Sequence, residues 1–428
     1  MVKEEFLQFI WKHGFFLRKK MKTACGRSLE ILKPGEHNFH AGPDFFNASI
    51  RLEQLVWAGN VEIHLHASDW IKHGHHLDPA YDNVILHVVK EFDGDIWNSR
   101  GRRIHTLVMD FPKQLSTQYD TLWNDENWLP CNMYIRSVPS DRLQQWFRLL
   151  QAERLQQKTG RISSILRQQS MNHEETFYRA LASGYGLPIN SLPFELVSSR
   201  IPLQLLLELR DSLPELEALL FGQSGFLHPG LIHGPYATKL MELYSEKVAS
   251  LPGKPVPRHL WKFLRLRPAS FPTLRLSQFA SLIHLHFPIT GSLLSIKSIN
   301  EFEQLFRVKA SEYWDTHYLF GKCSPPSVKY MGHQSILTLI INVIVPFLYT
   351  LGKTEHNTGA IRQAKEILSE LEAESNHIIK KWANFGVKPR NAFESQALIQ
   401  LHNNYCKQKR CLDCQIGAGF IKSVIHEK

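Results

Sequence analysis

The sequence contains no run of 18 or more uncharged apolar residues, which is the length that a helix needs to cross a bilayer. Its first residues lack the basic and then apolar profile of a secretory signal. The longest apolar run, residues 336–351, is interrupted by Asn342 and Pro346, and we expect it to form a buried helix. Cysteine is scarce too, since six in 428 residues do not make a disulfide scaffold. We therefore expect a cytoplasmic protein.

No single period recurs along the chain, so a repeat solenoid is not expected. Positive charge is in excess, because 50 Lys and Arg residues stand against 40 Asp and Glu residues, a net charge of +10. A basic surface favours an acidic polymer as partner, nucleic acid ahead of an anionic membrane. We expect nucleic acid, DNA ahead of RNA, and no membrane.

Residues 35–89 combine turn signals, strand-like runs and a high density of His, Asp and Glu. Asp44 follows a Gly-Pro pair at the entrance of one strand, and Glu62 lies in the alternating run VEIHLH. Because strand side chains alternate between faces, Glu62, His64 and His66 should share the face opposite the apolar residues. Two carboxylates at neighbouring strand ends can hold a hard divalent cation. We expect Asp44 and Glu62 to bind Mg²⁺ or Mn²⁺, with His64 beside them.

The histidines of this region form a second group, since six of the 22 in the chain fall between positions 64 and 87. Imidazole ligands favour Zn²⁺, whereas carboxylates favour Mg²⁺ or Mn²⁺. Hydrogen-bonded structural histidines are the alternative. Glu4 or Glu5 could add a carboxylate, although the helix dipole alone favours Glu in a first turn. The group that could surround the site or form a second metal site comprises His66, Asp69, His73, His75, His76, Asp78 and His87.

The first part of the chain has the pattern of a mixed sheet with one or two helices. Apolar residues at helical spacing predict a helix over residues 4–16, ending near Gly14. Strand-like runs follow at residues 28–32, 45–55, from 61 onward, 84–89 and 103–111. We assign residues 1–135 to this domain.

From residue 141 onward, apolar residues recur at helical spacing, with Pro and Gly between the stretches. We expect an irregular α-helical domain over residues 136–400, which makes the fold class α+β. Within it, Arg265, Arg267 and Arg275 could position a nucleic-acid backbone, with Phe271 stacking on a base. Alternatively, these arginines pin a junction between helices.

The tail, residues 401–428, contains three cysteines in a C-x4-C-x2-C spacing, namely Cys406, Cys411 and Cys414. Thiolates at such spacing suit zinc or an iron–sulfur cluster, and the spacing does not distinguish the two. A closed site needs a fourth ligand. Cys131 is the first candidate, Cys323 the second and His402 the third; with Cys131, the tail would pack on the first domain.

Several phrases together resemble an uncharacterised bacterial family, domain of unknown function 2851. They are GPDF (42–45), VEIH (61–64), SDW (68–70), DPAY (78–81), VILHVV (84–89), FGQSGFL (221–227), RLRPASFPTLRLSQ (265–278) and the terminal YC-x4-CLDC. The resemblance covers essentially the whole chain. It implies membership of the family and no particular activity.

The order of the first elements, with Pro43-Asp44 and then Glu62-x-His64, resembles the PD-(D/E)XK nucleases. His64 stands where that superfamily carries Lys, and it could orient water or accept its proton. Some of those nucleases hold an iron–sulfur cluster with one upstream cysteine and three near the C-terminal end. Cys131, Cys406, Cys411 and Cys414 resemble that arrangement.

Our first hypothesis is a metal-dependent nuclease with Asp44, Glu62 and His64 at its centre. The second is a nucleic-acid-binding or scaffolding protein that keeps a nuclease-like fold without catalysis; salt-dependent binding that ignores divalent cations would distinguish it. The third is a zinc hydrolase built on the histidines, which metal analysis would separate from the first.

Overall fold

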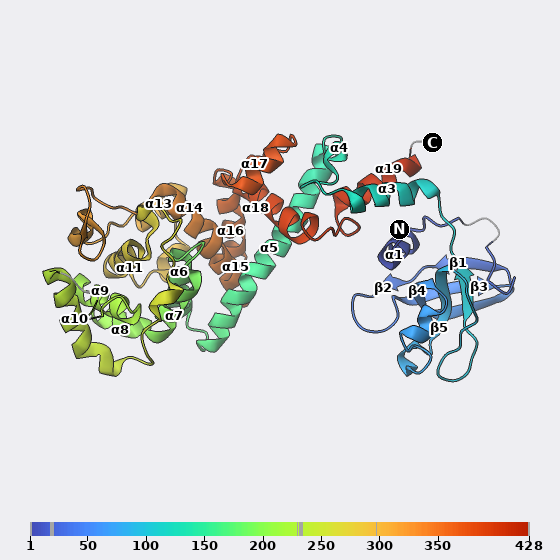
Figure 1. Ribbon diagram of the computed structural model, residues 1–428, viewed down its shortest axis with the longest axis horizontal. Coiled ribbons are helices and arrows are strands. Elements are labelled where there is room, and N and C mark those ends of the chain that lie inside the picture. The colour runs from blue at the N-terminus through green and yellow to red at the C-terminus, as the bar shows by residue number, and fades with distance from the viewer. Residues whose placement is uncertain (1, 18–20, 229, 231–233, 297, 427–428) are drawn as a thin grey trace. The chain divides into compact units, whose positions relative to one another are not determined.

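The structure is a computed structural model that describes residues 2–17, 21–228, 230, 234–296 and 298–426. The chain divides into two compact units (Figure 1). Unit 1 comprises Met1–Trp146 with Leu401–Lys428, and unit 2 comprises Phe147–Gln400. Unit 1 contains the curled mixed sheet and unit 2 is mostly helical, so the expected α+β class is confirmed.

The sheet of unit 1 has six strands in the order β1-β3-β4-β5-β6, with β2 also paired to β3. The β1–β3 and β3–β4 pairs are antiparallel, whereas β4–β5 and β5–β6 are parallel. The short elements α2 (Asp69–Lys72) and η1 (Pro79–Tyr81) lie in the crossover that the parallel pair β4–β5 requires. The strands are β1 (Leu29–Lys33), β2 (Glu36–His37), β3 (Phe45–Leu52), β4 (Leu55–His66), β5 (Val84–Glu91) and β6 (His105–Val108).

Two strand limits differ from expectation. The run predicted over residues 45–55 ends at Leu52, because Glu53 has a φ of 57° and the chain turns into β4 there. Strand β4 therefore begins at Leu55 rather than at Val61. The apolar run of residues 84–89 is a fully buried strand, as predicted, because neighbours pair along both of its edges.

Helix α1 (Glu4–His13) packs against β4. Its buried face includes Phe6 and Ile10, and the Trp11 indole donates a hydrogen bond to the carbonyl of Pro34 at 2.9 Å. Gly14 has a φ of 66° and caps the last carbonyls, so the helix ends where the sequence predicted.

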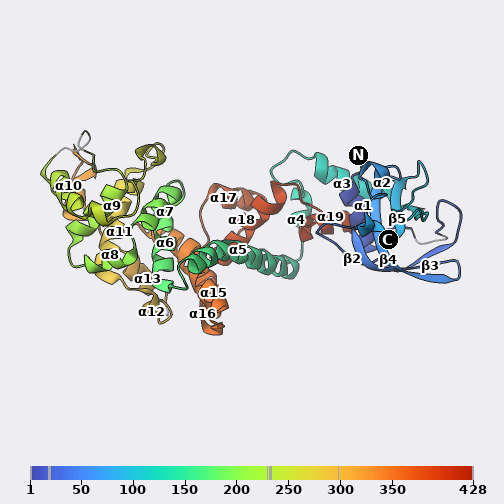
Figure 2. The same ribbon diagram turned by 90° about the horizontal axis from the view of Figure 1, so that it is seen from below.

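The tail of the chain packs within unit 1. Helix α19 (Gln415–His426) lies beside α3 (Lys113–Asn124) in both views and also contacts α4 (Asn132–Ile135) (Figures 1 and 2). Gly417 is required at the start of α19, because a Cβ there would lie 2.4 Å from the carbonyl oxygen of Cys411. The π-helical turn η7 (His402–Cys406) precedes the residues that lead into α19.

Unit 2 is built from helices around one apolar core. A small hairpin, β7 (His317–Leu319) with β8 (Lys322–Cys323), was not predicted from the sequence. The helices are α5 (Ser140–Gln168, which begins in unit 1), α6 (His173–Tyr185), α7 (Ser191–Arg200), α8 (Leu203–Glu208), α9 (Leu213–Gln223), α10 (Pro235–Lys247), α11 (Pro272–His286), α12 (Thr290–Leu293), α13 (Ile299–Phe306), α14 (His333–Leu339), α15 (Val345–Thr354), α16 (Thr358–Glu370), α17 (His377–Asn384) and α18 (Ala392–Leu401).

One continuous helical stretch of the described chain, His333–Thr354, is long and apolar enough to cross a membrane, with a mean hydropathy of 2.0 over its most apolar window. Within the structure, 78% of that window is buried. It combines α14, a π-helical turn and α15. This is the buried helix expected for residues 336–351.

Candidate metal centre

Asp44 and Glu62 meet where β3 begins beside β4, because Phe45 pairs with Val61 in the antiparallel register. The backbone N–H of Asp44 donates to Glu62 Oε2 at 3.0 Å. In return, the backbone N–H of Ile63 donates to Asp44 Oδ2 at 2.9 Å. Each carboxylate is thus held by the backbone beside the other, which fixes the pair at one point of the sheet.

Both carboxyls are poor in water contact, and Glu62 is only 5% exposed. Burial raises the pKa of Asp44 to about 7, and the neighbouring Glu62 contributes to this rise. Burial likewise raises the pKa of Glu62 to about 7. A hard divalent cation would replace the protons and offset the repulsion, so the oxygen donors fit Mg²⁺ or Mn²⁺.

Helix α1 adds two side chains at helical spacing. The Gln8 amide donates to Asp44 Oδ1 at 2.9 Å. One turn earlier, the pKa of Glu4 is raised to about 7, first by burial and then by Asp44 and Glu62. Glu5 is exposed. Of the two glutamates considered from the sequence, Glu4 therefore borders the carboxylate pair.

His64 lies on the same face of β4 as Glu62, as the alternation predicted, and is 1% exposed. Its Nδ1 is 2.8 Å from His87 Nε2. Its Nε2 is 3.1 Å from His73 Nδ1 and 3.5 Å from Glu62 Oε1. Burial, with the nearby rings of His73 and His75, lowers the pKa of His64 to about 3, so this ring is neutral.

His75 completes the group from the segment between α2 and η1. Its Nε2 is 3.3 Å from Glu62 Oε1, and its ring stacks on Tyr81 with centroids 3.8 Å apart. Ligand nitrogens of His64, His73 and His75 all lie within 4.8 Å of one another. The structure therefore brings His64 and His75 to Oε1 of Glu62, with His73 beside His64, whereas Oε2 accepts from the backbone of Asp44.

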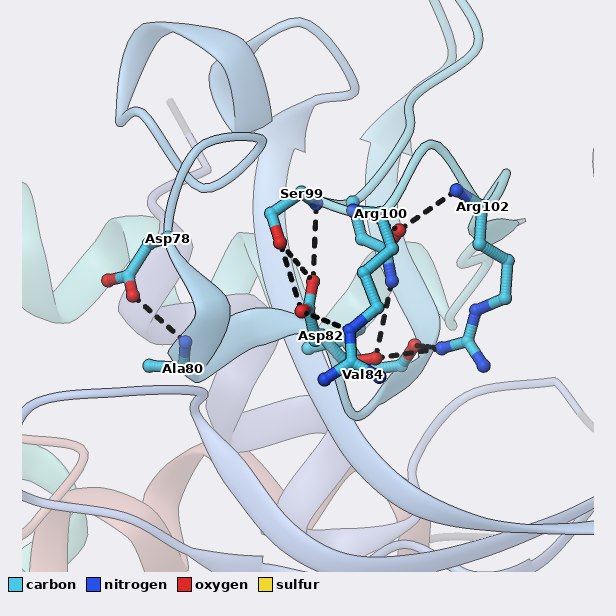
Figure 3. A network of polar contacts seen from close by, with 8 residues as sticks. Asp78, Ala80, Asp82, Val84, Ser99, Arg100 and Arg102 are labelled. Carbon is cyan, nitrogen blue, oxygen red and sulfur yellow. Dashed lines mark hydrogen bonds and ion pairs between the residues drawn. The ribbon is translucent and has the colours of Figure 1, made fainter.

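A network of polar contacts holds the end of the crossover, residues 82–84, to residues 99–102 (Figure 3). The Asp82 carboxylate accepts hydrogen bonds from the Ser99 hydroxyl at 2.8 Å and from Arg100 Nε at 2.9 Å. The Arg102 guanidinium donates to the carbonyls of Asp82 and Val84. These contacts tie η1 and the start of β5 to residues 99–102.

Other residues predicted near the site have local partners instead. His66 is 44% exposed and lies 3.7 Å from Glu91. Asp69 accepts from the backbone of His66 at 2.9 Å and pairs with Lys72 at 2.7 Å. Asp78 caps η1 by accepting from the N–H of Ala80. His76 has a buried Nδ1 without a hydrogen bond. None of these four belongs to the three-histidine group.

Four free cysteines gather in unit 1. Burial raises the pKa of Cys131, Cys406 and Cys411, and neighbouring thiols, Cys414 among them in each case, raise it further. Burial raises the pKa of Cys414 as well, although the N–H groups of Gly417 and Ile416 act in the opposite direction. Four neighbouring cysteines, two of them buried and two half-buried, whose thiolate forms would repel one another, fit a group that takes thiolate ligands.

The two other candidates for a fourth ligand differ in their location. Cys323 lies exposed in unit 2, beside His317, and His402 stacks on Trp128 in unit 1.

The three arginines considered for nucleic-acid contact differ in burial. Arg265 and Arg267 are exposed. Arg275 is only 7% exposed, and its guanidinium donates to Gln278 and Ser335 inside unit 2. The expected contact of Arg275 with phosphate is therefore corrected to the alternative, a junction between helices, because its guanidinium donates to side chains of the packed helices.

Sequence reasoning missed Gln8 and Tyr81. Gln8 could have been found, because it is four residues after Glu4 and therefore on the same helix face. Tyr81 gave no comparable indication, since its contact with His75 depends on the folding of the intervening turn.

Fold and geometry together define an α+β protein with a buried carboxylate–imidazole centre in its sheet-containing unit. The family model described as "Protein of unknown function (DUF2851)" matches residues 4–377, and the chain belongs to this family, as its motifs predicted. The match includes Asp44, Glu62 and the three histidines His64, His73 and His75, and it ends before Cys406. No curated protein and no solved structure matches the chain.

Proposed function

We propose that the protein is a metal-dependent nuclease that hydrolyses phosphodiesters of DNA or RNA. The observation that carries the proposal is the pair of half-buried Asp44 and buried Glu62, each held by the backbone beside the other. A divalent cation bound there would polarise a phosphodiester and activate water. The order of α1, the strands and the carboxylates supports a PD-(D/E)XK-like core for unit 1.

The residues of this site have distinct roles in the proposed reaction. Asp44 and Glu62 hold the cation, and Glu4 borders them from α1. His64 would orient the attacking water, because its ring is neutral and its Nε2 faces Glu62, whereas its lowered pKa makes it a weak acceptor of the proton from that water. His73 is exposed and lies 3.1 Å from that nitrogen, so it offers the proton a path to solvent. Arg265 and Arg267 are the remaining candidates for contact with the substrate backbone.

The cysteine site has a structural role in this proposal. Cys131, Cys406, Cys411 and Cys414 would hold an iron–sulfur cluster, and the supporting observation is that Cys414 raises the pKa of the other three thiols, which places the four side chains near one another. Zinc is the alternative that metal analysis separates.

A cleavage assay tests the proposal. Anaerobically purified full-length protein is incubated with labelled single- and double-stranded DNA and RNA, with Mg²⁺ or Mn²⁺ and with chelator. We expect metal-dependent cutting by the wild type and a loss of at least about 100-fold in Glu62→Gln and in Asp44→Asn, because cation ligands are removed. Circular dichroism and nucleic-acid binding should change little.

Glu91→Gln is the matched control, because Glu91 is exposed at the end of the neighbouring strand β5. Cutting that survives Glu62→Gln would assign the activity to another site or to a contaminant. Absence of cutting on every substrate, with salt-dependent binding retained, would favour the nucleic-acid-binding protein without catalysis.

A further inference from the structure

We infer that His64, His73 and His75, together with Oε1 of Glu62, form a second metal position that takes a transition-metal dication such as Zn²⁺, Fe²⁺ or Co²⁺. Binding at this position needs no nuclease activity. Only its place beside a first, carboxylate position rests on the proposed function.

The separations between the ligand atoms support a four-coordinate site. His64 Nε2 is 3.1 Å from His73 Nδ1 and 3.5 Å from Glu62 Oε1. His75 Nε2 is 3.3 Å from the same oxygen. Bonds of about 2.0–2.1 Å in a tetrahedral site place neighbouring ligand atoms about 3.3–3.4 Å apart. Three of the six pairs of ligand atoms therefore already have the spacing of a four-coordinate set, and the three imidazole nitrogens lie within 4.8 Å of one another.

The chemistry of the donors decides the class of metal. Three imidazole nitrogens and one carboxylate oxygen suit Zn²⁺, Fe²⁺ or Co²⁺, whereas Mg²⁺ prefers oxygen alone. The two oxygens of Glu62 divide between the two positions, since Oε2 accepts from the backbone beside Asp44 and Oε1 faces the imidazoles. The centre thus has a hard side and a softer side that share one carboxylate.

Outer contacts fix which nitrogens are presented. His87, fully buried, meets His64 at Nδ1, so Nε2 is the nitrogen left for a metal. The His75 ring lies on Tyr81 and against the edge of Trp70. The Asp82 network of Figure 3 fixes the residue that directly follows Tyr81. His73 is exposed, which gives an ion a path in from solvent.

The same separations also allow a purely hydrogen-bonded histidine network, and the two arrangements assign His64 different roles. With a metal bound, His64 Nε2 is a ligand, and it no longer orients or deprotonates water. Without one, the ring keeps the role given to it in the proposed mechanism. The experiment therefore has to detect binding directly rather than through cleavage.

Full-length protein, purified anaerobically with its cysteine site loaded and treated with a mild chelator, is titrated with Co²⁺ and followed by visible absorption and calorimetry. We expect one equivalent with the ligand-field spectrum of a four-coordinate site, displaced by Zn²⁺ but not by Mg²⁺. In His73→Asn, Co²⁺ affinity should fall at least 10-fold. Any signal from the cysteines is common to both proteins and cancels in the difference spectrum.

His66→Asn is the matched control, since His66 lies on the same strand as His64 and outside the three-histidine group. It should bind Co²⁺ like the wild type, and so should Asp44→Asn, in which cleavage is lost. A wild type that binds Co²⁺ but cuts none of the nucleic-acid substrates would support this position and overturn the nuclease. If the wild type does not bind Co²⁺, or if His73→Asn binds it with equal affinity, the second metal position is overturned and the histidines form a hydrogen-bonded network only.

Discussion

Glu4 and Glu5 are neighbours in sequence with different surroundings, and this pair offers a test at the scale of single residues. Glu4 is half-buried beside Asp44 and Glu62, whereas Glu5 is exposed on the other side of α1. We expect Glu4→Gln to weaken Mn²⁺ binding about 10-fold, or about 1.4 kcal/mol, because a negative charge beside the cation is lost. Calorimetric titration measures this affinity.

Glu5→Gln is the control for that substitution, because it makes the same chemical change in the same helical turn. It should leave Mn²⁺ affinity unchanged within error. Equal losses in the two variants would mean that the helix dipole or the general charge of α1 matters, and not the position of Glu4 beside the pair.

The raised pKa values of Asp44 and Glu62 predict how cation binding depends on pH. Both are about 7, so binding at pH 6 must displace protons that are absent at pH 8. The neutral ring of His64 contributes no competing proton in this range. Mn²⁺ affinity should rise roughly 10- to 100-fold from pH 6 to pH 8, and Asp44→Asn should flatten this dependence.

The folding stability of the metal-free protein changes with pH in the direction opposite to that of the Mn²⁺ affinity. The unfolded chain releases these protons near pH 4, whereas the folded protein keeps them to about pH 7. The stability contributed by the two carboxyls is therefore lost as pH rises through about 7. Mn²⁺ should raise the melting temperature more at pH 8 than at pH 6, and an equal rise at both values would contradict the assignment.

At the scale of elements, the sequence predicted what depends on local periodicity. The apolar face of α1 and its stop at Gly14 followed from helical spacing, and the shared face of Glu62 and His64 followed from strand alternation. The turn at Glu53 was missed, because a left-handed φ is uncommon for this residue type and leaves no mark in the sequence.

The candidate site was predictable in its strand part and not in its loop part. Asp44, Glu62 and His64 lie on paired strands, where register brings them together. His73 and His75 come from the crossover, whose end is held by contacts of Asp82 with Ser99 and Arg100 further along the chain, and strand alternation does not place its residues. Burial of Arg275 is likewise a property of helix packing, which charge in the sequence does not reveal.

At the scale of the molecule, two segments far apart in the chain build unit 1, and the four cysteines lie where these segments meet. Cys131 precedes α4, while the other three precede α19, which contacts α3 and α4. A bound cluster would cross-link the tail to the N-terminal segment, and its binding free energy would add to the stability of unit 1.

Loss of the cluster should therefore destabilise one unit selectively. We expect Cys411→Ser to lack iron and acid-labile sulfide and to lower the melting temperature of unit 1 by at least about 5 °C, since about 1 kcal/mol corresponds to 2–4 °C for a unit of this size. Scanning calorimetry should show the transition of unit 2 unchanged, because its core is formed by other residues. Cys323→Ser, an exposed change in unit 2, should keep both the iron and the stability of unit 1. Stoichiometric zinc in place of iron in the wild type would refute the cluster. An unchanged melting temperature of unit 1 in Cys411→Ser would refute it too, because ligands that contribute stability cannot be removed without a loss of stability.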